Sequence, residues 1–272
     1  TCCPTGRLRS TSRARGCAQP SVADADLDGL TRGGNFESLR FTGGSLDGET
    51  VPAGTTFSNV TFEDVTLRGC ELEALEFRQC TFLRCRFDSS AFRESTFARC
   101  VFFDKDSESG CSLRFTNLRL ARFEDCDLSM CRLDRARLHQ IYIARSQGQG
   151  LSAREATAVH EIVGGFELAE GSLVDCNLAY ADFTGADLTR CELSGNRLSH
   201  AVFDRAILRE AQLTDCELHG VSAEGVEIRG ADLRGSELSG LDVREVDLDG
   251  VRITVSQQSA LLEPLGLIVT DD

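Results

Sequence analysis

The residues of this sequence that could do chemistry are 13 Cys, four His and two clusters of acidic residues, in a chain of 272. A catalytic site needs a nucleophile, an acid-base pair or a metal set, and the motifs that supply these have fixed spacings. The chain contains no GxSxG, HExxH, CxxC or GxxxxGK pattern, and its histidines are scattered: His139, His160, His200 and His219. We therefore predict no catalytic residue, no metal, no cofactor and no enzyme activity.

Two acidic clusters have the composition of calcium-binding loops. The stretch DADLDG at 24–29 places carboxylates at loop positions 1, 3 and 5 and Gly at 6, as an EF-hand-like loop requires. Its twelfth position is Asn35, where a bidentate Glu is needed, and ADLDG at 25–29 also fits the five-residue unit described below. The second stretch, DKDSESG at 104–110, has its Gly one position late and Phe115 at position 12. We favour the five-residue unit for the first cluster and predict no metal site at the second.

A five-residue period organises most of the chain. Every fifth residue from Leu168 to Ile253 is Leu, Phe, Ile or Val, except Ala223, and the same period runs unbroken from 57 to 102. Shorter runs cover 36–51, with one residue slipped in near Pro52, and 113–143. Helices repeat every 3.6 residues and two-faced strands every 2, so neither explains the pattern. A period of five needs a chain that turns a corner in every unit.

The unit resembles the pentapeptide-repeat family, written A(D/N)LXX, as in ADF at 181–183 and ADL at 186–188 and 231–233. The resemblance covers 36–253 apart from two interruptions. It implies an all-β fold, a right-handed quadrilateral parallel β-helix with four units in each coil, whose apolar centre and the residue two before it point inward. Coils about 4.8 Å apart require that second inward residue to be small.

Cysteine fits this description of a small inward residue. Ten cysteines stand two positions before an apolar centre: Cys70, Cys80, Cys85, Cys100, Cys111, Cys126, Cys131, Cys176, Cys191 and Cys216. We predict Ala-like fillers. On a four-unit coil, Cys80 would stack on Cys100 and Cys111 on Cys131 near disulfide distance, but so many buried thiols favour the reduced form and a reducing cytosol.

Two interruptions of the period predict projecting loops. Phe102 and Leu113 are eleven residues apart rather than ten, which places a first loop at about 103–112. A longer break before Leu168 places a second loop at about 146–166, where a helical spacing precedes two glycines: Ala156, Val159, Val163, Gly164 and Gly165. Such loops are either tolerated insertions on a solenoid face or the carriers of binding specificity.

Within the pentapeptide-repeat proteins the chain resembles the Qnr group, the quinolone-resistance proteins that shield bacterial type II topoisomerases. The likeness lies in FFDKDSESGCSL at 102–113, CDLSM at 126–130, LDVREVDLDGVRI at 241–253 and SQQSALLEPLGLIV at 256–269. It implies a cytoplasmic bacterial protein that binds DNA gyrase or topoisomerase IV as an acidic, DNA-mimicking rod. It further implies protection from a fluoroquinolone or a natural gyrase poison, in antibiotic resistance or self-immunity, and a homodimer formed through the C-terminus.

The resemblance also implies roles for individual residues. The topoisomerase-binding loops would present Phe103, Asp104, Lys105, Asp106, Ser107, Glu108, Arg154, Glu155, His160 and Glu161. The acidic surface would present Asp182, Asp187, Glu192, Asp232, Glu237, Asp242 and Asp247. The apolar tail, which would cap the last coil or meet a second copy, contains Leu261, Leu262, Leu265, Leu267 and Ile268.

The net charge of the chain limits the classes of partner that it is expected to bind. The net charge is −14, and residues 166–253 carry 18 Asp and Glu against 8 Arg. Direct nucleic-acid binding is not expected, because it needs basic surface to displace counterions, and no apolar run is long enough to span a membrane. An alternative function is a pentapeptide scaffold for an unrelated protein partner.

The chain is thus expected to have three parts. Residues 1–35 form an N-terminal segment that is either disordered or partly capping, 36–253 form the β-helix with its two loops, and 254–272 form a C-terminal helix and tail.

Overall fold

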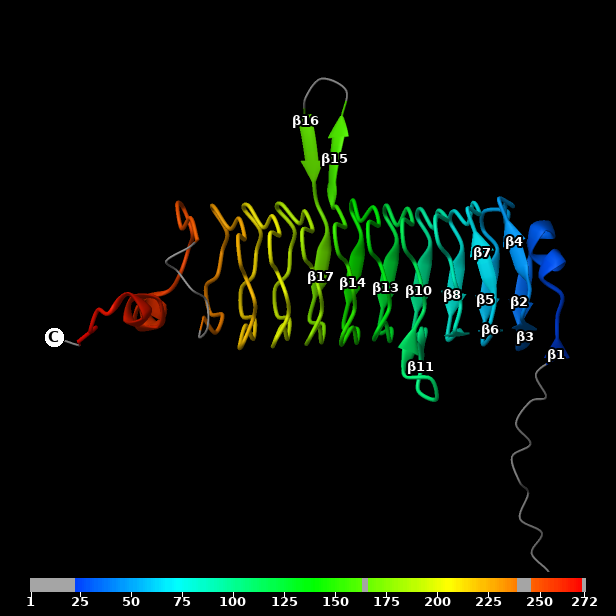
Figure 1. Cartoon of the computed structure of the whole chain (residues 1–272). Helices are drawn as coiled ribbons and strands as arrows, with labels where there is room; N and C mark the ends of the chain where they lie inside the picture. Colours follow the sequence, from blue (N-terminus) through cyan, green and yellow to red (C-terminus); the bar gives the residue numbers. More distant parts are fainter. Residues whose placement is uncertain (1–22, 163–165, 239–245, 271–272) are drawn as a thin grey trace, which may run out of the picture.

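The chain folds into a rod of stacked coils, a parallel β-solenoid (Figure 1). The structure is a computed structural model and describes residues 23–162, 166–238 and 246–270. The longest sheet joins seven strands in the order β17-β14-β13-β10-β8-β5-β2. These are β2 (Asn35–Glu37), β5 (Thr56–Ser58), β8 (Glu76–Arg78), β10 (Thr96–Ala98), β13 (Arg122–Glu124), β14 (Tyr142–Ala144) and β17 (Ser172–Val174). Single parallel bridges, up to Asp232↔Arg252, continue this face toward the C-terminus. The predicted all-β solenoid is confirmed.

Shorter sheets lie on two of the other faces. One contains β1 (Ala23–Asp24), β3 (Leu39–Thr42), β6 (Thr61–Glu63) and β9 (Thr81–Leu83), and another pairs β4 (Ser45–Asp47) with β7 (Thr66–Arg68). The other strands form two antiparallel hairpins that leave the rod. β11 (Phe103–Asp104) pairs with β12 (Ser109–Gly110), and β15 (Val159–Ile162) pairs with β16 (Phe166–Ala169).

Each coil contains four five-residue units, because paired residues of neighbouring coils are 20 residues apart, as in Phe57↔Phe77. The rod therefore has four faces. We number them by the apolar centres of one coil: Phe77 on face 1, Phe82 on face 2, Phe87 on face 3 and Phe92 on face 4. The first coil is one residue longer, since Phe36 pairs with Phe57, which confirms the residue slipped in near Pro52.

The last residue of each unit turns the corner in a left-handed backbone conformation. It follows the apolar centre by two positions, and its φ is 53° at Arg84, 56° at Met130 and 61° at Tyr180. At many corners the next amide then donates to the carbonyl of the centre, as Ser90 N does to Phe87 O at 3.1 Å, which closes a type II turn. Three extended residues and a two-residue corner make five, and this is the physical origin of the period.

Stacked phenylalanines fill the N-terminal half of the core. On face 1 the rings of Phe57, Phe77, Phe97 and Phe123 lie nearly parallel, with centroids 4.5 to 4.7 Å apart. Rings of adjacent faces meet edge-on, as Phe77 and Phe82 do at 5.6 Å. Both arrangements are favourable for aromatic rings, and replacing one such buried ring by Ala costs about 3–5 kcal/mol.

The first interruption inserts six residues at a corner. Face 3 pairs Arg86 with Ser112, an offset of 26 residues, and the β11–β12 hairpin leaves the rod between faces 2 and 3. Because six is not a multiple of five, this insertion shifts the phase, which is why the sequence places the first loop correctly.

The second interruption is shorter than the sequence predicts. Residues 146–158, assigned above to a loop, continue the coil, with Leu151, Ala153, Ala156 and Ala158 buried. Ile143 pairs with Leu173, so the insertion is ten residues long and consists of the β15–β16 hairpin. The prediction failed because ten residues leave the period in phase, and because small centres at 148, 153 and 158 hide the coil.

The helical spacing predicted for 156–163 is not a helix in the structure. Ala156 is on the coil and Val159 begins β15, so the helical spacing is wrong there. Leu168, taken above as an apolar centre, lies in β16. The other residues of that prediction, Val163, Gly164 and Gly165, lie outside the described residues.

Both described ends carry helical turns. The 3-10 helix η1 (Leu27–Arg32) is capped by Asp26 and buries Leu27 and Leu30 against the first coils. The C-terminal segment contains η2 (Val255–Gln257), α1 (Gln258–Leu262) and η3 (Glu263–Leu265). The buried Gln257 side chain donates from Nε2 to Leu233 O and Ser236 O, both at 2.7 Å, and so joins this segment to the last coils.

All ten cysteines of the repeat are buried and free. Burial raises the pKa of Cys176 to about 11 and that of Cys191 to about 12, and it raises the pKa of Cys131 further. At pH 8 a thiol of pKa 11 is ionised in only about one molecule in a thousand, and the thiolate is the reactive form.

Because all ten thiols are buried, we expect them to be inert toward Ellman's reagent in the native protein at pH 8 and to react together once guanidinium unfolds it. Mass spectrometry after alkylation identifies which cysteines were labelled. Stoichiometric labelling of Cys176 or Cys191 in the folded state would contradict the inward filler role.

Candidate functional site

The first loop is a short, tight hairpin on the edge between faces 2 and 3. Its strands pair Phe103 with Gly110 and Asp104 with Ser109. The turn exposes Lys105, Asp106, Ser107 and Glu108 to solvent, whereas Phe103 is half-buried. The predicted contact residues of this loop are thus brought together, with one exception.

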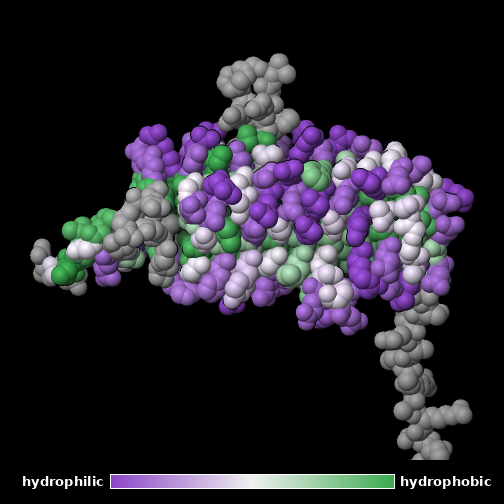
Figure 2. Space-filling view, in the orientation of Figure 1, coloured by the Kyte–Doolittle hydropathy of each residue, from purple (hydrophilic) through white to green (hydrophobic). Residues whose placement is uncertain are grey.

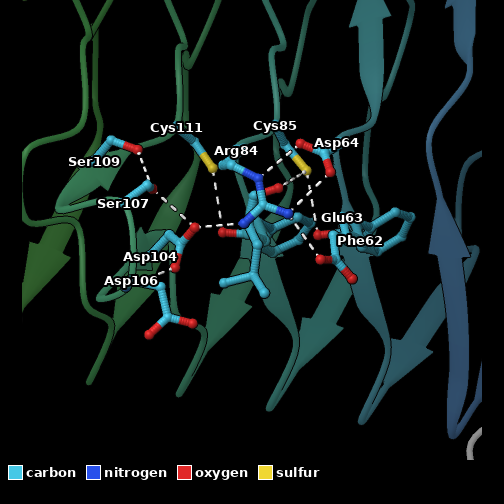
Figure 3. A network of polar contacts seen from close by, with 12 residues as sticks. Phe62, Glu63, Asp64, Arg84, Cys85, Asp104, Asp106, Ser107, Ser109 and Cys111 are labelled. Atoms are coloured by element: carbon cyan, nitrogen blue, oxygen red, sulfur yellow. Dashed lines mark hydrogen bonds and ion pairs between the residues drawn. The ribbon is translucent and has the colours of Figure 1, made fainter.

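The exception is Asp104, whose carboxylate is turned into the rod (Figure 3). Its Oδ2 accepts from Arg84 Nη1 at 2.5 Å, and only 5% of its side chain is exposed. Arg84 also donates from Nη2 to Glu63 Oε1 at 2.7 Å and from Nε to Asp64 Oδ1 at 2.8 Å. The Arg84 guanidinium therefore connects the loop to the two preceding coils, its own and that of Glu63 and Asp64. Asp104 is an anchor of the loop rather than a contact for a partner.

The anchor is reinforced from within the loop. Ser107 Oγ donates to Asp104 Oδ2 at 2.8 Å, and the Asp106 amide donates to Oδ1 at 3.0 Å. The Ser107 hydroxyl, Arg84 and that amide together lower the pKa of Asp104. The carboxylate is therefore ionised at neutral pH, and the positive partner stays charged because its own pKa is raised.

Gly110 fixes the other end of the hairpin by close approach. A Cβ at this position would lie 2.3 Å from the Cys131 amide nitrogen and 2.4 Å from the Met130 carbonyl carbon. Backbone atoms at that distance cannot move aside as a flexible side chain can, so the loop rests directly on the next coil.

The second loop leaves the opposite edge of the rod, between faces 4 and 1 (Figure 1). In it His160 pairs with Leu168 and Glu161 with Glu167. Arg154 and Glu155, predicted on the same loop, lie instead on the coil, where Glu155 Oε2 accepts from Arg135 Nε at 2.7 Å. The two loops therefore do not form one site.

The predicted acidic surface is spread around the rod rather than gathered on one side. Asp182 lies on face 3, Asp187 on face 4, Glu192 on face 1 and Glu237 on face 2. Asp232 is buried and bound by Arg234 Nη2 at 2.6 Å, which holds the pKa of its carboxyl below the usual range. Asp247 is exposed, and Asp242 lies outside the described residues.

The apolar tail divides into a buried and an exposed part. Leu261 is buried against the core, and Leu262 is half-buried. Leu265, Leu267 and Ile268 are exposed by 48%, 52% and 87%. Figure 2 shows apolar residues gathered at this end, whereas the visible side of the rod is mostly hydrophilic.

Three large apolar side chains that the sequence reading missed are exposed on the coils: Phe115, Met130 and Tyr180. Met130 and Tyr180 share the edge that carries the first loop, and the Tyr180 ring stacks on His200 at 5.0 Å. Their signal in the sequence is a large apolar residue at the last position of a unit, where the backbone is left-handed and a polar residue or Gly is usual.

Within the described residues, no group of three or more His, Cys, Asp or Glu is arranged to hold a metal ion. Over the same part of the chain, no helix is long and apolar enough to cross a membrane.

The anchor can be tested through Lys105, which is the only lysine of the chain. A lysine-specific protease therefore reports on the opening of this loop alone. We expect Asp104→Asn to raise the cleavage rate roughly tenfold, because the amide cannot replace the charged contact with Arg84. The matched control is Asp106→Asn, whose carboxylate is exposed. Each rate is divided by that of the unfolded variant, and equal ratios for the two variants would refute the anchor.

The stability of the anchored loop should depend on pH and decrease in acid, because the pKa of Asp104 is lowered. The folded pKa of Asp104 lies below its ordinary value of 3.8, so the stabilisation is complete above about pH 5 and is lost as the pH falls through the lowered folded value. Hydrogen exchange at the amides of 104–109 should therefore accelerate, relative to a coil segment such as 66–68, only in the acid range.

Known proteins resemble this chain in sequence and in structure. The pentapeptide-repeat family matches residues 109–140, 172–209 and 211–250, in eight copies. The pentapeptide repeat protein QnrB4 of Escherichia coli is 33% identical over 85 residues, 31% of this chain and 40% of the relative. The quinolone resistance pentapeptide repeat protein QnrB96 of Scandinavium goeteborgense is 31% identical over an equal length. The chain thus matches under half the length of these curated relatives.

The structural match is more extensive. Full-length QnrB1, described as a plasmid-mediated fluoroquinolone resistance protein, superposes with a TM-score of 0.65 and 28% identity. The superposition covers 84% of this chain and 100% of QnrB1. A trypsin-treated form of QnrB1 gives a TM-score of 0.66 and covers 87% of this chain. The chain therefore contains pentapeptide repeats and resembles the Qnr proteins in sequence and in fold.

Proposed function

We propose that this protein binds a bacterial type II DNA topoisomerase, gyrase or topoisomerase IV, and protects it from a quinolone-type or natural gyrase poison. The observation that carries the proposal is the superposition on all of QnrB1, a fluoroquinolone resistance protein. In this proposal, protection follows from binding to the topoisomerase rather than from a reaction on the drug.

The first loop supplies a preorganised contact. Since Asp104 and Gly110 hold its two strands, the tip presents Lys105, Asp106 and Glu108 in one arrangement. A partner then loses little conformational entropy when it binds this tip. The second loop offers a separate contact from the opposite edge.

The acidic half of the rod would act where the enzyme holds DNA. Its carboxylates lie on all four faces, so a channel that wraps the rod would meet negative charge from every side, as it does around a duplex. Mimicry by charge alone is insufficient, because Asp182 and Asp232 are paired with arginines. The loops would therefore supply much of the specificity.

Protection is tested by the supercoiling of relaxed plasmid with purified gyrase, ciprofloxacin and increasing amounts of the native protein. Supercoiling should recover, and cleaved complexes should decrease, at protein concentrations well below those that inhibit the enzyme. No rescue with ciprofloxacin or with a natural gyrase poison would favour a scaffold with an unrelated partner.

The loop contribution is tested by replacing Lys105, Asp106 and Glu108 by Ala, which leaves the anchor intact. The protective concentration should rise about tenfold, the effect of losing ~1.4 kcal/mol of binding free energy. A matched control replaces exposed Arg119, Glu94 and Glu71, with the same change of net charge. Unchanged protection by the loop variant would remove this loop from the interface.

We also propose a homodimer through the exposed end of the tail, because apolar surface of this kind is usually covered. Light scattering should give twice the chain mass of 29.6 kDa for the native protein. Ile268→Asp together with Leu267→Asp should give the single mass, while Tyr180→Asp, at an exposed apolar residue on the rod, should not. A native protein of single mass would refute the dimer.

A further inference from the structure

One part of face 3 has a charge opposite to that of the whole chain. We call it the arginine face. It consists of Arg86, Arg114 and Arg132, with Met130 and Phe115 at its two edges. Arg86 and Arg132 occupy equivalent positions two coils apart, through the pairings Arg86↔Ser112 and Ser112↔Arg132. At strand spacing this separation is about 10 Å.

The carboxylates between these arginines are already engaged. Asp88 accepts a short hydrogen bond from Ser112 Oγ and a second one, of 3.2 Å, from the Arg114 amide. Asp134 accepts from Ser152 Oγ in the same way, and only 13% of its side chain is exposed. Its second oxygen lies 3.6 Å from Nε of both Arg114 and Arg132, so one carboxylate serves two guanidinium groups.

The guanidinium groups retain hydrogen-bonding capacity. Among the described residues, no carboxylate lies within 4 Å of Arg86, which is exposed. Nε of Arg114 is buried and donates no hydrogen bond in the structure. Each guanidinium has five N–H donors. The arginine face is therefore an array of donors that the protein itself does not satisfy.

A groove runs beside these arginines, under the first loop. Its volume is about 430 Å³, and its walls include Arg84, Arg86, Glu108, Met130 and Arg132. Since Arg84 is held by three carboxylates, the available positive charge comes from the face 3 arginines. The anchored loop thus forms one wall of a concave surface on which three face 3 arginines, Arg86, Arg114 and Arg132, outnumber the two lining carboxylates, Asp88 and Glu108.

Two exposed apolar side chains flank the arginine face. Met130 is 47% exposed and Phe115 is 46% exposed, and both have left-handed backbones, with φ of 56° and 59°. That conformation costs an L residue about 1–2 kcal/mol, and neither side chain offsets it by full burial. Arg114 and Arg135 lie 5.4 and 5.8 Å from the centroid of the Phe115 ring. Arginine beside exposed aromatic and Met side chains is the composition of protein-binding surfaces.

We propose that the arginine face and its groove bind an acidic peptide segment of a partner protein, in which Asp or Glu recurs at about every third residue among large apolar residues. Carboxylates about 10 Å apart would accept from Arg86 and Arg132, and the apolar side chains would cover Met130 and Phe115. A nucleic acid fits less well, because its continuous phosphates would also meet Glu108 and the net charge of −14. The inference goes beyond the proposed function, since it concerns any partner that presents such a segment.

The test measures fluorescence anisotropy of a short fluorescein-labelled peptide whose Glu or Asp residues are three positions apart, about 10 Å in an extended chain, with Leu or Phe between them. The native protein should bind it, and the same peptide with Lys in place of the acids should not bind. Arg86→Glu with Arg132→Glu should weaken binding at least about tenfold. The matched control, Arg119→Glu with Arg137→Glu, reverses two exposed charges on face 4 of the same region and should bind as the native protein does.

Several outcomes would overturn the proposal. They are a native protein that does not bind the acidic peptide, equal weakening by both pairs of substitutions, or binding of a labelled DNA duplex in preference to the peptide through the same arginines. Circular dichroism melting checks that the variants are folded, and Arg86→Gln with Arg132→Gln repeats the test without charge reversal. The assay contains no topoisomerase, so its result is separate from that of the supercoiling assay.

Discussion

The hydrogen bonds between successive coils are the constraint on which the rest of the structure depends. Each coil donates to and accepts from its neighbours along all four faces, so equivalent side chains must stack at about strand spacing. An aromatic ring tolerates that spacing by stacking, as Phe77 and Phe97 do at 4.7 Å. The second inward residue, two positions before the centre, is usually small, as Cys, Ala and Ser are, and larger buried residues such as Leu75 and Ile141 are fewer. The burial of these thiols thus has a packing reason.

The same stacking orders the surface. Positions 20 residues apart lie side by side, and opposite charges use this neighbourhood repeatedly, as in Asp64 with Arg84, Asp125 with Arg145 and Arg190 with Glu210. Most of these pairs are exposed, and each contributes little to stability alone. The exception is the buried Asp104, which continues the column of Asp64 and Arg84 and so anchors the first loop to the rod.

The period predicts the solenoid, and it locates an insertion that disturbs its phase but not the limits of one that keeps the phase. A six-residue insertion after Phe102 shifts every later centre and is visible. The ten-residue hairpin after Ala158 leaves Leu173 in phase, so neither its limits nor the continued coil before it could be read from spacing. The composition of a loop also does not reveal which way its carboxylates point. Asp104 and Asp106 are alike in sequence, and only the position of Arg84, one coil earlier in the chain, distinguishes the anchor from the exposed residue.

A solenoid cannot close around a ligand, so its recognition must come from rigid features added to its edges and faces. The first loop meets this requirement because it is clamped by Arg84 and seated on Met130 and Cys131. It also changes the face beside it, since it makes a flat row of arginines into a groove. The acidic C-terminal coils and the arginine-lined groove are two surfaces of different charge on one rod. A partner with basic and acidic surfaces at the matching separation can then bind in only one direction along the rod.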